Sequence, residues 1–396
     1  MSGAFGAVPG DLLAVDMPPG PAWIDVVHRC WAEHVALMPI DVRLSRTERR
    51  TLVDLAQPAA VLDANGEVTV FGGSSPVALE VAVVAATSGT AGAPRLAELS
   101  RTAVEAAVRA SADQLGSARS RWVCCLTPAH IGGLLVLMRG EVLDVGVDVH
   151  DRFEPATVAA ANGGFVPLVP TMVSRLAAAG SRLDGVTLLV GGGALERPTA
   201  DGVRALGARV VTTYGLTESC GGVVYDGLAI AGMQVRLDDG GAIELRGPTV
   251  MQGYRGDPVA TGAAFDVQGW LRTGDLGEQG DDRRLSVLGR EDDVIRTGGE
   301  KVWPDEVERI LERHPKVADV GVAGEPHPEW GQQVVAYVVP ATIDDPPTLE
   351  ELRDWTRERV TAFKAPRRLV LVGEIPRTSS GKRRRHRLAA SSSADG

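Results

Sequence analysis

Short apolar runs that end in turns rich in glycine and hydroxyl residues constrain the fold of this chain most. Residues 81–86 lead into TSGTAGAPR, residues 187–190 lead into GGGAL, and residues 209–213 lead into YGLTES. We interpret each run as a buried strand, and helical patterns are expected after the turns. This alternation indicates an open α/β sheet, which binds ligands at the carboxyl ends of its strands. A ligand site is therefore expected in these turns.

The pattern changes after residue 240. Residues 242–247 (AIELRG) and 284–290 (RLSVLGR) alternate apolar and polar side chains, which is typical of half-exposed antiparallel strands. The strand pattern stops at residues 289–293. We therefore predict a large N-terminal domain over residues 1–291 and a small C-terminal domain over residues 292–396.

The last hundred residues have the pattern of a separate α+β unit. Pro304 lies near the start of a helix whose apolar face is predicted to contain Val307, Ile310 and Leu311. A capping box beginning at Thr348 predicts a second helix.

Composition limits the class of protein. The 396 residues, 44% hydrophobic and 23% charged, allow about two to three globular domains. A net charge of -10 argues against nucleic-acid binding, because nucleic-acid binders neutralise phosphates with clustered Lys and Arg. No run reaches the ~20 apolar residues of a membrane span, so we expect a cytoplasmic protein. The spacing of Cys30, Cys124, Cys125 and Cys220 predicts reduced thiols rather than a zinc or redox site.

The most informative segment is residues 87–95, TSGTAGAPR. Its hydroxyl side chains and backbone amides can point toward a phosphate, and its glycines let the chain approach closely. The Walker pattern GxxxxGK[ST] is absent. Taken alone, the segment is equally consistent with a surface turn.

Six segments, in the same order, resemble motifs of the adenylate-forming ligases, the acyl-CoA synthetase superfamily. They are 87–95, 214–218 (YGLTE), 270–275 (WLRTGD), 289–293 (GREDD), 298–301 (GGEK) and 376–382 (PRTSSGK). The resemblance implies an α/β fold: a large N-terminal domain with stacked sheets and a distorted β-barrel part, plus a small mobile α+β domain. It also implies that ATP and a carboxylic acid form an acyl-adenylate and pyrophosphate, and that coenzyme A then releases AMP.

The resemblance also implies which residues bind the nucleotide. Tyr214 would lie against adenine, Glu218 would supply an oxygen to phosphate-bound Mg²⁺, and Asp275 would accept from the ribose hydroxyls. The set implied for ATP and AMP is Thr87, Ser88, Gly89, Thr90, Gly92, Arg95, Gly191, Gly192, Gly193, Tyr214, Gly215, Thr217, Asp275 and Arg290. Thr217 and Glu218 would also take part in catalysis.

Lys382 is the residue that the resemblance assigns to the first chemical step. Its ammonium would bridge the substrate carboxylate and the α-phosphate, where one such donor typically contributes ~3–4 kcal/mol to the transition state. The small domain would then turn about a hinge at Asp292. Gly298, Gly299 and Lys301 would border the passage for the pantetheine arm of coenzyme A.

A second set of similarities concerns the acid. Residues 128–134 (PAHIGGL), 169–171 and 210–222, together with the short chain, resemble the o-succinylbenzoate–CoA ligases of menaquinone synthesis. His130, Arg175 and Thr213 would lie at the acid pocket, with Arg175 a candidate partner for the second carboxylate of the substrate.

The phosphate segment departs from the family pattern, which usually has lysine in place of Arg95 and threonine in place of Ala91. Arginine keeps the charge but is planar and bulkier, so weaker ATP binding is predicted. Three alternatives stay open: a ligase for another aryl or alicyclic acid, an adenylation module that loads a carrier protein, and a degenerate nucleotide-binding paralogue. The expected partners are the acid, ATP and coenzyme A, with no nucleic acid or membrane span, and the protein is either a monomer or a homodimer.

Overall fold

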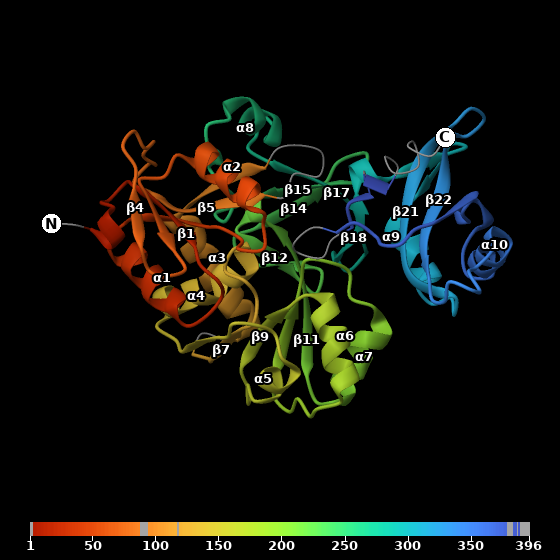
Figure 1. The fold of residues 1–396 in the computed structure, drawn as a ribbon, viewed down its shortest axis with the longest axis horizontal. Helices are drawn as coiled ribbons and strands as arrows, with labels where there is room; N and C mark the ends of the chain where they lie inside the picture. The colour runs from red at the N-terminus through yellow and green to blue at the C-terminus, as the bar shows by residue number, and fades with distance from the viewer. Residues whose placement is uncertain (1–2, 88–93, 117–118, 378–382, 386, 389–396) are drawn as a thin grey trace.

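A computed structural model describes residues 3–87, 94–116, 119–377, 383–385 and 387–388 (Figure 1). Ser88, Gly89, Thr90, Gly92 and Lys382, which the sequence motifs single out, lie outside the described residues. Within the described part of the chain, the strands form four sheets.

The first sheet has the strand order β16-β6-β5-β2-β1-β3-β4. Its strands β5, β2, β1 and β3 run parallel, and the flanking strands pair antiparallel. The bounds are β1 (Leu12–Asp16), β2 (Ala36–Pro39), β3 (Ala60–Asp63), β4 (Val68–Val70), β5 (Val81–Thr87), β6 (Arg95–Ser100) and β16 (Gly253–Tyr254). The central strands are almost continuously apolar because helices cover both of their faces.

The second sheet has the order β13-β12-β11-β10-β9-β7-β8. Strands β8, β7, β9, β10 and β11 run parallel to one another, and β12 and β13 are antiparallel additions. The bounds are β7 (Trp122–Cys124), β8 (Val147–Val149), β9 (Phe165–Leu168), β10 (Thr187–Val190), β11 (Arg209–Leu216), β12 (Gly221–Tyr225) and β13 (Leu228–Ala229).

Helices separate and cover these two sheets (Figure 1). Helices α1, α3 and α4 share one core with inner faces of both sheets, α2 packs on the outer face of the first sheet, and α5, α6 and α7 pack on the outer face of the second. The bounds are η1 (Ala4–Gly6), α1 (Ala22–Ala32), α2 (Arg46–Ala56), α3 (Arg101–Leu115), α4 (Ile131–Leu143), α5 (Pro155–Ala159), α6 (Pro170–Ala179), α7 (Arg197–Ala205) and η2 (Thr217–Ser219).

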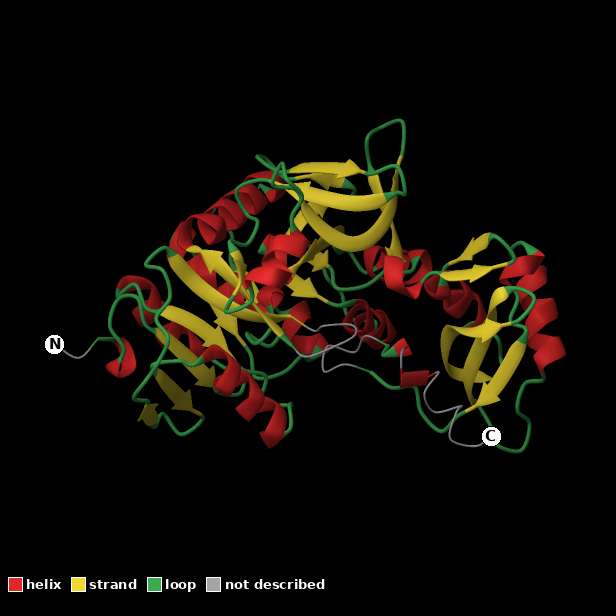
Figure 2. Ribbon diagram, turned by 90° about the horizontal axis from the view of Figure 1, so that it is seen from above, coloured by secondary structure: helices red, strands yellow, loops and turns green. Residues whose placement is uncertain are grey.

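The third sheet is a four-stranded antiparallel sheet that curls like half of a barrel (Figure 2). Its order is β14-β15-β17-β18, and α8 (Pro258–Ala264) lies between β16 and β17 in sequence. The bounds are β14 (Gln234–Leu237), β15 (Ala242–Arg246), β17 (Leu271–Gln279) and β18 (Leu285–Arg290).

The C-terminal part has its own sheet and core, seen at the right of Figure 1. Its sheet has the order β20-β19-β22-β21, with β23 beside β22, and α9 and α10 pack on it. The bounds are η3 (Glu291–Asp293), β19 (Ile295–Thr297), β20 (Glu300–Val302), α9 (Pro304–Leu311), β21 (Val317–His327), β22 (Gly331–Pro340), α10 (Leu349–Arg357), η4 (Ala362–Lys364) and β23 (Arg368–Leu371).

The expected fold class is confirmed, including the stacked sheets and the half-barrel. Two details were wrong. The strand that contains residues 81–86 continues into the antiparallel strand β6 and not into a helix. Ile310 is only partly buried on α9, whereas Glu308 is buried there. The boundary at residue 291 and the hinge at Asp292 stay predictions.

None of the helices in the described ranges is both long enough and apolar enough to cross a membrane.

Candidate active site

Tyr214, Asp275 and Arg290 come from three strands and meet at one point. The Tyr214 hydroxyl donates to Asp275 Oδ2 at 2.8 Å, and Arg290 Nη1 donates to Asp275 Oδ1 at 3.2 Å and to the Thr273 carbonyl at 2.8 Å. Burial, reinforced by the Asp275 carboxylate, raises the pKa of the Tyr214 phenol, so this hydroxyl stays a donor. These three residues, all predicted to bind the nucleotide, therefore form one oriented cluster.

Two glycines of the motifs are required by close packing. A Cβ atom on Gly215 would lie 1.8 Å from the Gly221 carbonyl oxygen, where β11 and β12 cross at a bulge. Gly274 has a φ of +69°, and a Cβ atom there would lie 2.8 Å from Arg290 Nη2. Glycine at position 215 lets β11 approach β12 closely, and glycine at position 274 leaves room for the guanidinium of Arg290 beside β17.

The residues 191–193 follow β10 directly, beside β11. A Cβ atom on Gly191 would lie 2.4 Å from Thr213 Oγ1, and Gly192 has a φ of +77°. Thr213 donates to the Val190 carbonyl at 3.4 Å. The glycine segment and Thr213 are therefore neighbours at the carboxyl ends of two parallel strands, where α/β sheets bind ligands.

Thr217 and Glu218 lie in the short helix η2 that follows β11. Glu218 Oε1 accepts a hydrogen bond from the Tyr254 hydroxyl at 2.9 Å. Burial and the neighbouring carboxylate raise the pKa of Tyr254, so the phenol is the donor and Glu218 the charged acceptor. Tyr254 was not predicted from the sequence.

The two ends of the phosphate segment lie side by side. Thr87 at the end of β5 pairs with Arg95 at the start of β6. The Arg95 guanidinium carbon lies 5.4 Å from the centre of the Tyr254 ring, within the range of a cation–π contact. Thr87, Arg95, Tyr254 and Glu218 thus mark one end of the site.

The side chains of η2 fit a magnesium ion that ATP carries. Protein sites for Mg²⁺ in nucleotide enzymes usually provide one or two carboxylates, and the phosphates and water provide the other ligands. Glu218 is a single carboxylate with one oxygen oriented by Tyr254, and no cluster of three His, Cys, Asp or Glu with metal-binding spacing occurs among the described residues.

His130 lies at the N-terminus of α4 and contacts two residues of the β2–α2 loop. Arg43 donates to both oxygens of Asp41 at 2.8 and 2.7 Å, and its Nη2 lies 3.1 Å from His130 Nε2. A guanidinium can only donate, so Nε2 accepts and a neutral His130 carries its proton on Nδ1. Burial opposes ionisation of Asp41, but hydrogen bonds from Arg43 bring its pKa below the usual value.

Arg175 is exposed on α6, with its guanidinium carbon 5.1 Å from the centre of the Phe153 ring. No described contact joins it to His130 or Thr213, so its role at the acid pocket stays a prediction.

Gly298 and Gly299 form the turn between β19 and β20, with φ values of +60° and +88°. A Cβ atom on Gly298 would lie 2.9 Å from Trp330 Cε3, whereas one on Gly299 would meet no atom within 4 Å. Lys301 is exposed on β20. Asp292 lies in η3, between the third sheet and the C-terminal sheet.

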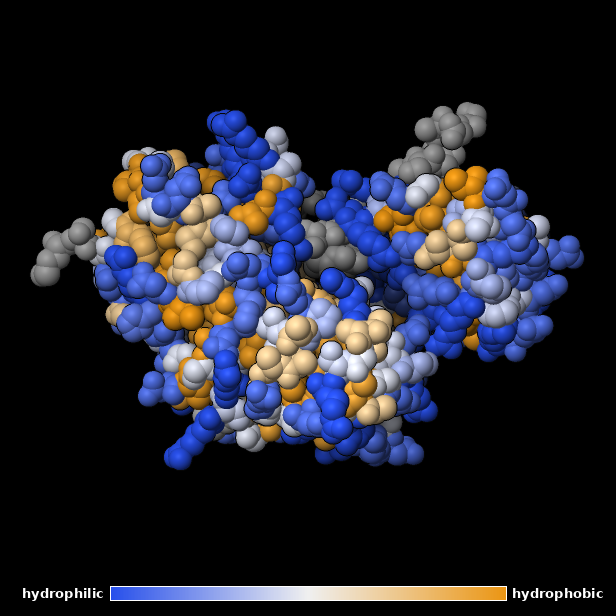
Figure 3. All heavy atoms as spheres, turned by 60° about the horizontal axis from the view of Figure 1, so that its bottom comes forward, coloured by the Kyte–Doolittle hydropathy of each residue, from blue (hydrophilic) through white to orange (hydrophobic). Residues whose placement is uncertain are grey.

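A hollow separates the C-terminal part from the rest of the molecule, and hydrophilic residues line much of its rim (Figure 3). Among the described residues, an ion pair between Arg313 of the C-terminal part and Glu196 just before α7 joins the two parts, with Arg313 Nη2 3.4 Å from Glu196 Oε2. The C-terminal part thus faces the loop that follows the glycine segment 191–193.

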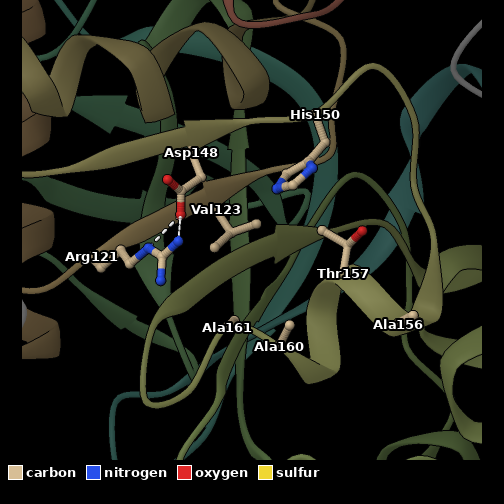
Figure 4. A pocket seen from close by; sticks show the side chains of 8 residues that line it. All are labelled: Arg121, Val123, Asp148, His150, Ala156, Thr157, Ala160 and Ala161. Carbon is tan, nitrogen blue, oxygen red and sulfur yellow. Dashed lines mark hydrogen bonds and ion pairs between the residues drawn. The ribbon is translucent and has the colours of Figure 1, made fainter.

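A separate pocket of about 350 Å³ lies at the edge of the second sheet, beside α5 (Figure 4). Arg121 and Asp148 point toward each other there and form an ion pair, which neutralises both charges. None of the predicted nucleotide, acid or coenzyme A residues lines this pocket. We therefore place the candidate site at the β10, β11 and η2 ends.

Comparison with known proteins places the chain in a class. A family model described as "AMP-binding enzyme" matches residues 72–255, and one described as "AMP-binding enzyme C-terminal domain" matches residues 306–382. The chain accordingly contains both domains of an AMP-binding enzyme.

Individual relatives narrow the class. The chain is 39% identical to the "Probable 2-succinylbenzoate–CoA ligase" of Mycobacterium tuberculosis, over 76% of this chain and 82% of the relative. It is 29% identical to the 2-succinylbenzoate–CoA ligase of Bacillus licheniformis, over 97% of this chain and 90% of the relative. The o-succinylbenzoate CoA synthetase of Bacillus subtilis, solved with its acyl-adenylate intermediate, superposes with a TM-score of 0.88 at 27% identity, covering 97% of this chain and 89% of that chain. The chain belongs to the 2-succinylbenzoate–CoA ligase family of AMP-binding enzymes, which confirms the resemblance found in the motifs.

Proposed function

We propose that this chain joins o-succinylbenzoate to coenzyme A through an acyl-adenylate, with ATP and Mg²⁺ as co-substrate and cofactor. The observation that carries the proposal is the 39% identity to a 2-succinylbenzoate–CoA ligase of which the chain covers 82%. A structure of the Bacillus subtilis enzyme in complex with ATP and magnesium, at a TM-score of 0.87 and 28% identity over 97% of this chain and 90% of that chain, supports the nucleotide and the metal.

In the first half-reaction, a carboxylate oxygen of the acid forms a bond to the α-phosphorus and pyrophosphate leaves. Tyr214, Asp275 and Arg290 would hold the adenosine, and Thr217 would hydrogen-bond the α-phosphate. Glu218 would hold Mg²⁺, which neutralises phosphate charge when it is bound. Lys382 would lie between the two anions and lower their repulsion.

The acid would lie beside Thr213 and His130. o-Succinylbenzoate carries two carboxylates, one of which reacts, so the other needs a cationic partner when it leaves water. Arg175 is the predicted partner for that carboxylate. Arg43 already shares its charge with Asp41 and is better suited to orient His130.

In the second half-reaction, the thiol of coenzyme A attacks the acyl carbon and AMP leaves. We infer that the C-terminal domain turns about Asp292 between the two steps, and that the turn at Gly298 and Gly299 then borders the pantetheine arm.

The test is an assay of the protein with ATP, Mg²⁺, coenzyme A and a panel of acids, in which pyrophosphate, AMP and thioester are measured. We expect all three products with o-succinylbenzoate. Activity on benzoates but not on o-succinylbenzoate would contradict the substrate, and pyrophosphate without thioester would favour transfer to a carrier protein. No pyrophosphate with any acid would mean that the chain is not a ligase.

Lys382→Ala gives a separate test of the two steps. We expect adenylation to fall by two to three orders of magnitude, because one transition-state donor is worth ~3–4 kcal/mol. Thioester formation from preformed adenylate should stay close to the wild-type rate. Equal loss of both half-reactions would contradict a turn of the domain between them.

A further inference from the structure

The described residues on either side of the sequence segment 378–382 contact one another and β21. Arg377 and Arg383 form an isolated antiparallel bridge, and the Arg384 N–H donates to the Pro376 carbonyl at 2.8 Å. Arg377 Nη2 donates to both oxygens of Asp319 on β21 at 2.7 and 2.8 Å. Lys382 directly precedes Arg383 in the sequence.

Arg385 anchors the chain on the C-terminal side of Lys382 with a largely buried side chain. Its side chain is only 12% exposed, and it donates to Asp293 at 2.6 Å, to Glu308 at 2.7 and 3.0 Å, and to Asp305. Asp293 belongs to η3 and directly follows the predicted hinge residue Asp292, whereas Asp305 and Glu308 belong to α9. One guanidinium therefore ties the chain after Lys382 to the first residues beyond the hinge.

The burial of Glu308 shows that this ion cluster has a desolvation cost. Its side chain is 1% exposed, on the buried face of α9. Removing two charges from water costs several kcal/mol per ion, and an apolar pair of similar volume is often at least as stable. Stability alone therefore does not explain the ion cluster, whereas a need for one defined position does.

We propose that Arg385 is a positioning residue for adenylation: it makes the Lys382 segment move as one body with the part of the chain that begins at Asp293. This inference rests on the proposed function. In the adenylation orientation the anchor would hold the lysine at the reacting anions, and in the thioester-forming orientation the lysine would no longer be needed.

The experiment compares the two half-reactions in purified full-length protein. Adenylation is followed by ATP–pyrophosphate exchange with o-succinylbenzoate, and thioester formation is followed from preformed o-succinylbenzoyl adenylate and coenzyme A. For Arg385→Gln we expect at least a tenfold loss of adenylation and less than a twofold change in thioester formation. Arg385→Lys keeps the charge but not the forked set of donors, so its adenylation rate should lie between those of wild type and Arg385→Gln.

Glu308 keeps partners in these variants, because it still accepts from the Val322 N–H at 2.8 Å and from Arg383 at 3.3 Å. Arg368→Gln is the matched control, since it removes another arginine from a mostly buried carboxylate, Glu325, in the same domain. The control should lower Tm and leave the ratio of the two half-reactions unchanged.

A double-variant cycle tests the link to the hinge. If Arg385 acts through Asp293, the pair Asp293→Asn and Arg385→Gln should lose no more adenylation than Arg385→Gln alone. Equal losses in both half-reactions, an unchanged adenylation rate in Arg385→Gln, or additive effects in the cycle would overturn the inference. A wild-type protein that adenylates another acid overturns only the proposed substrate, and the same ratio is then measured with that acid.

Discussion

The hydrogen bond from Tyr254 to Glu218 leads to a quantitative prediction for Tyr254→Phe. The substitution removes one hydroxyl that donates to a charged carboxylate at 2.9 Å. Hydrogen bonds to charged groups contribute about 1.5–3 kcal/mol, and loss of a group that orients a metal ligand typically lowers metal affinity by about 10–100-fold. We therefore expect the Mg²⁺ concentration that half-saturates adenylation to rise by about 10–100-fold.

The assay is ATP–pyrophosphate exchange at fixed acid and limiting ATP, with free Mg²⁺ varied. Tyr225→Phe is the matched control, because Tyr225 is buried and donates to Ser111 Oγ at 2.9 Å, with no described contact to Glu218. The control should keep the wild-type Mg²⁺ dependence. An unchanged Mg²⁺ requirement in Tyr254→Phe would refute the orienting role, and a lower requirement would mean that Tyr254 competes with the ion for Glu218.

Three further predictions concern other parts of the chain. Arg95→Lys should lower the KM for ATP, because an ammonium is more compact than the guanidinium beside Tyr254, and a KM that does not fall would contradict this. Gly298→Ala should lower Tm more than Gly299→Ala, since both carry left-handed strain but only the first places a Cβ 2.9 Å from Trp330, and equal Tm values would argue against that contact. Hydrogen bonds from the Thr348 backbone and the Lys316 ammonium lower the pKa of Glu351 from 4.5 to about 2. The ionised carboxylate therefore stabilises the folded protein above pH 4.5, and this contribution is lost as the pH falls from 4.5 toward 2. The difference in free energy of unfolding between wild type and Glu351→Gln should shrink to zero over that pH range, and Glu350→Gln is the control that keeps the capping box. A difference that does not change with pH would refute this prediction.

The sequence was sufficient for residues that lie in continuous motifs. Tyr214, Asp275 and Arg290 were predicted as parts of one nucleotide site, and in the structure Tyr214 and Arg290 both donate hydrogen bonds to Asp275. The capping box at Thr348 was equally predictable, because it depends only on two residues three positions apart. It is present as predicted.

Tyr254 could not be found in this way. It reaches the site because β16 pairs with β6, which places Tyr254 opposite Ala97, more than 150 positions earlier in the chain. Arg43 and Asp41 likewise reach His130 only through the packing of the first sheet against α4. Local patterns contain no information on such pairings.

The error on α9 has a related cause. The helical period correctly placed Val307 and Leu311 inside, but it could not place Glu308, whose burial depends on arginines 75 and 77 residues later. A pattern of apolar residues treats every carboxylate as exposed. A buried carboxylate becomes predictable only when its cationic partners are known.

The hydrogen-bond and ion-pair partners of the carboxylates near the candidate site suggest why Asp275 and Glu218 suit different ligands. Asp275 and Asp41 are each paired with an arginine, Arg290 and Arg43, which compensates their charge. Glu218 accepts a hydrogen bond from a neutral phenol, and within the described residues it forms no ion pair. A compensated carboxylate can still accept hydrogen bonds from neutral hydroxyls such as those of ribose, whereas a divalent cation is attracted most strongly to an uncompensated one. The charges of the neighbouring residues are thus a second reason, besides the motifs, for the proposal that Glu218 holds Mg²⁺ and Asp275 binds ribose.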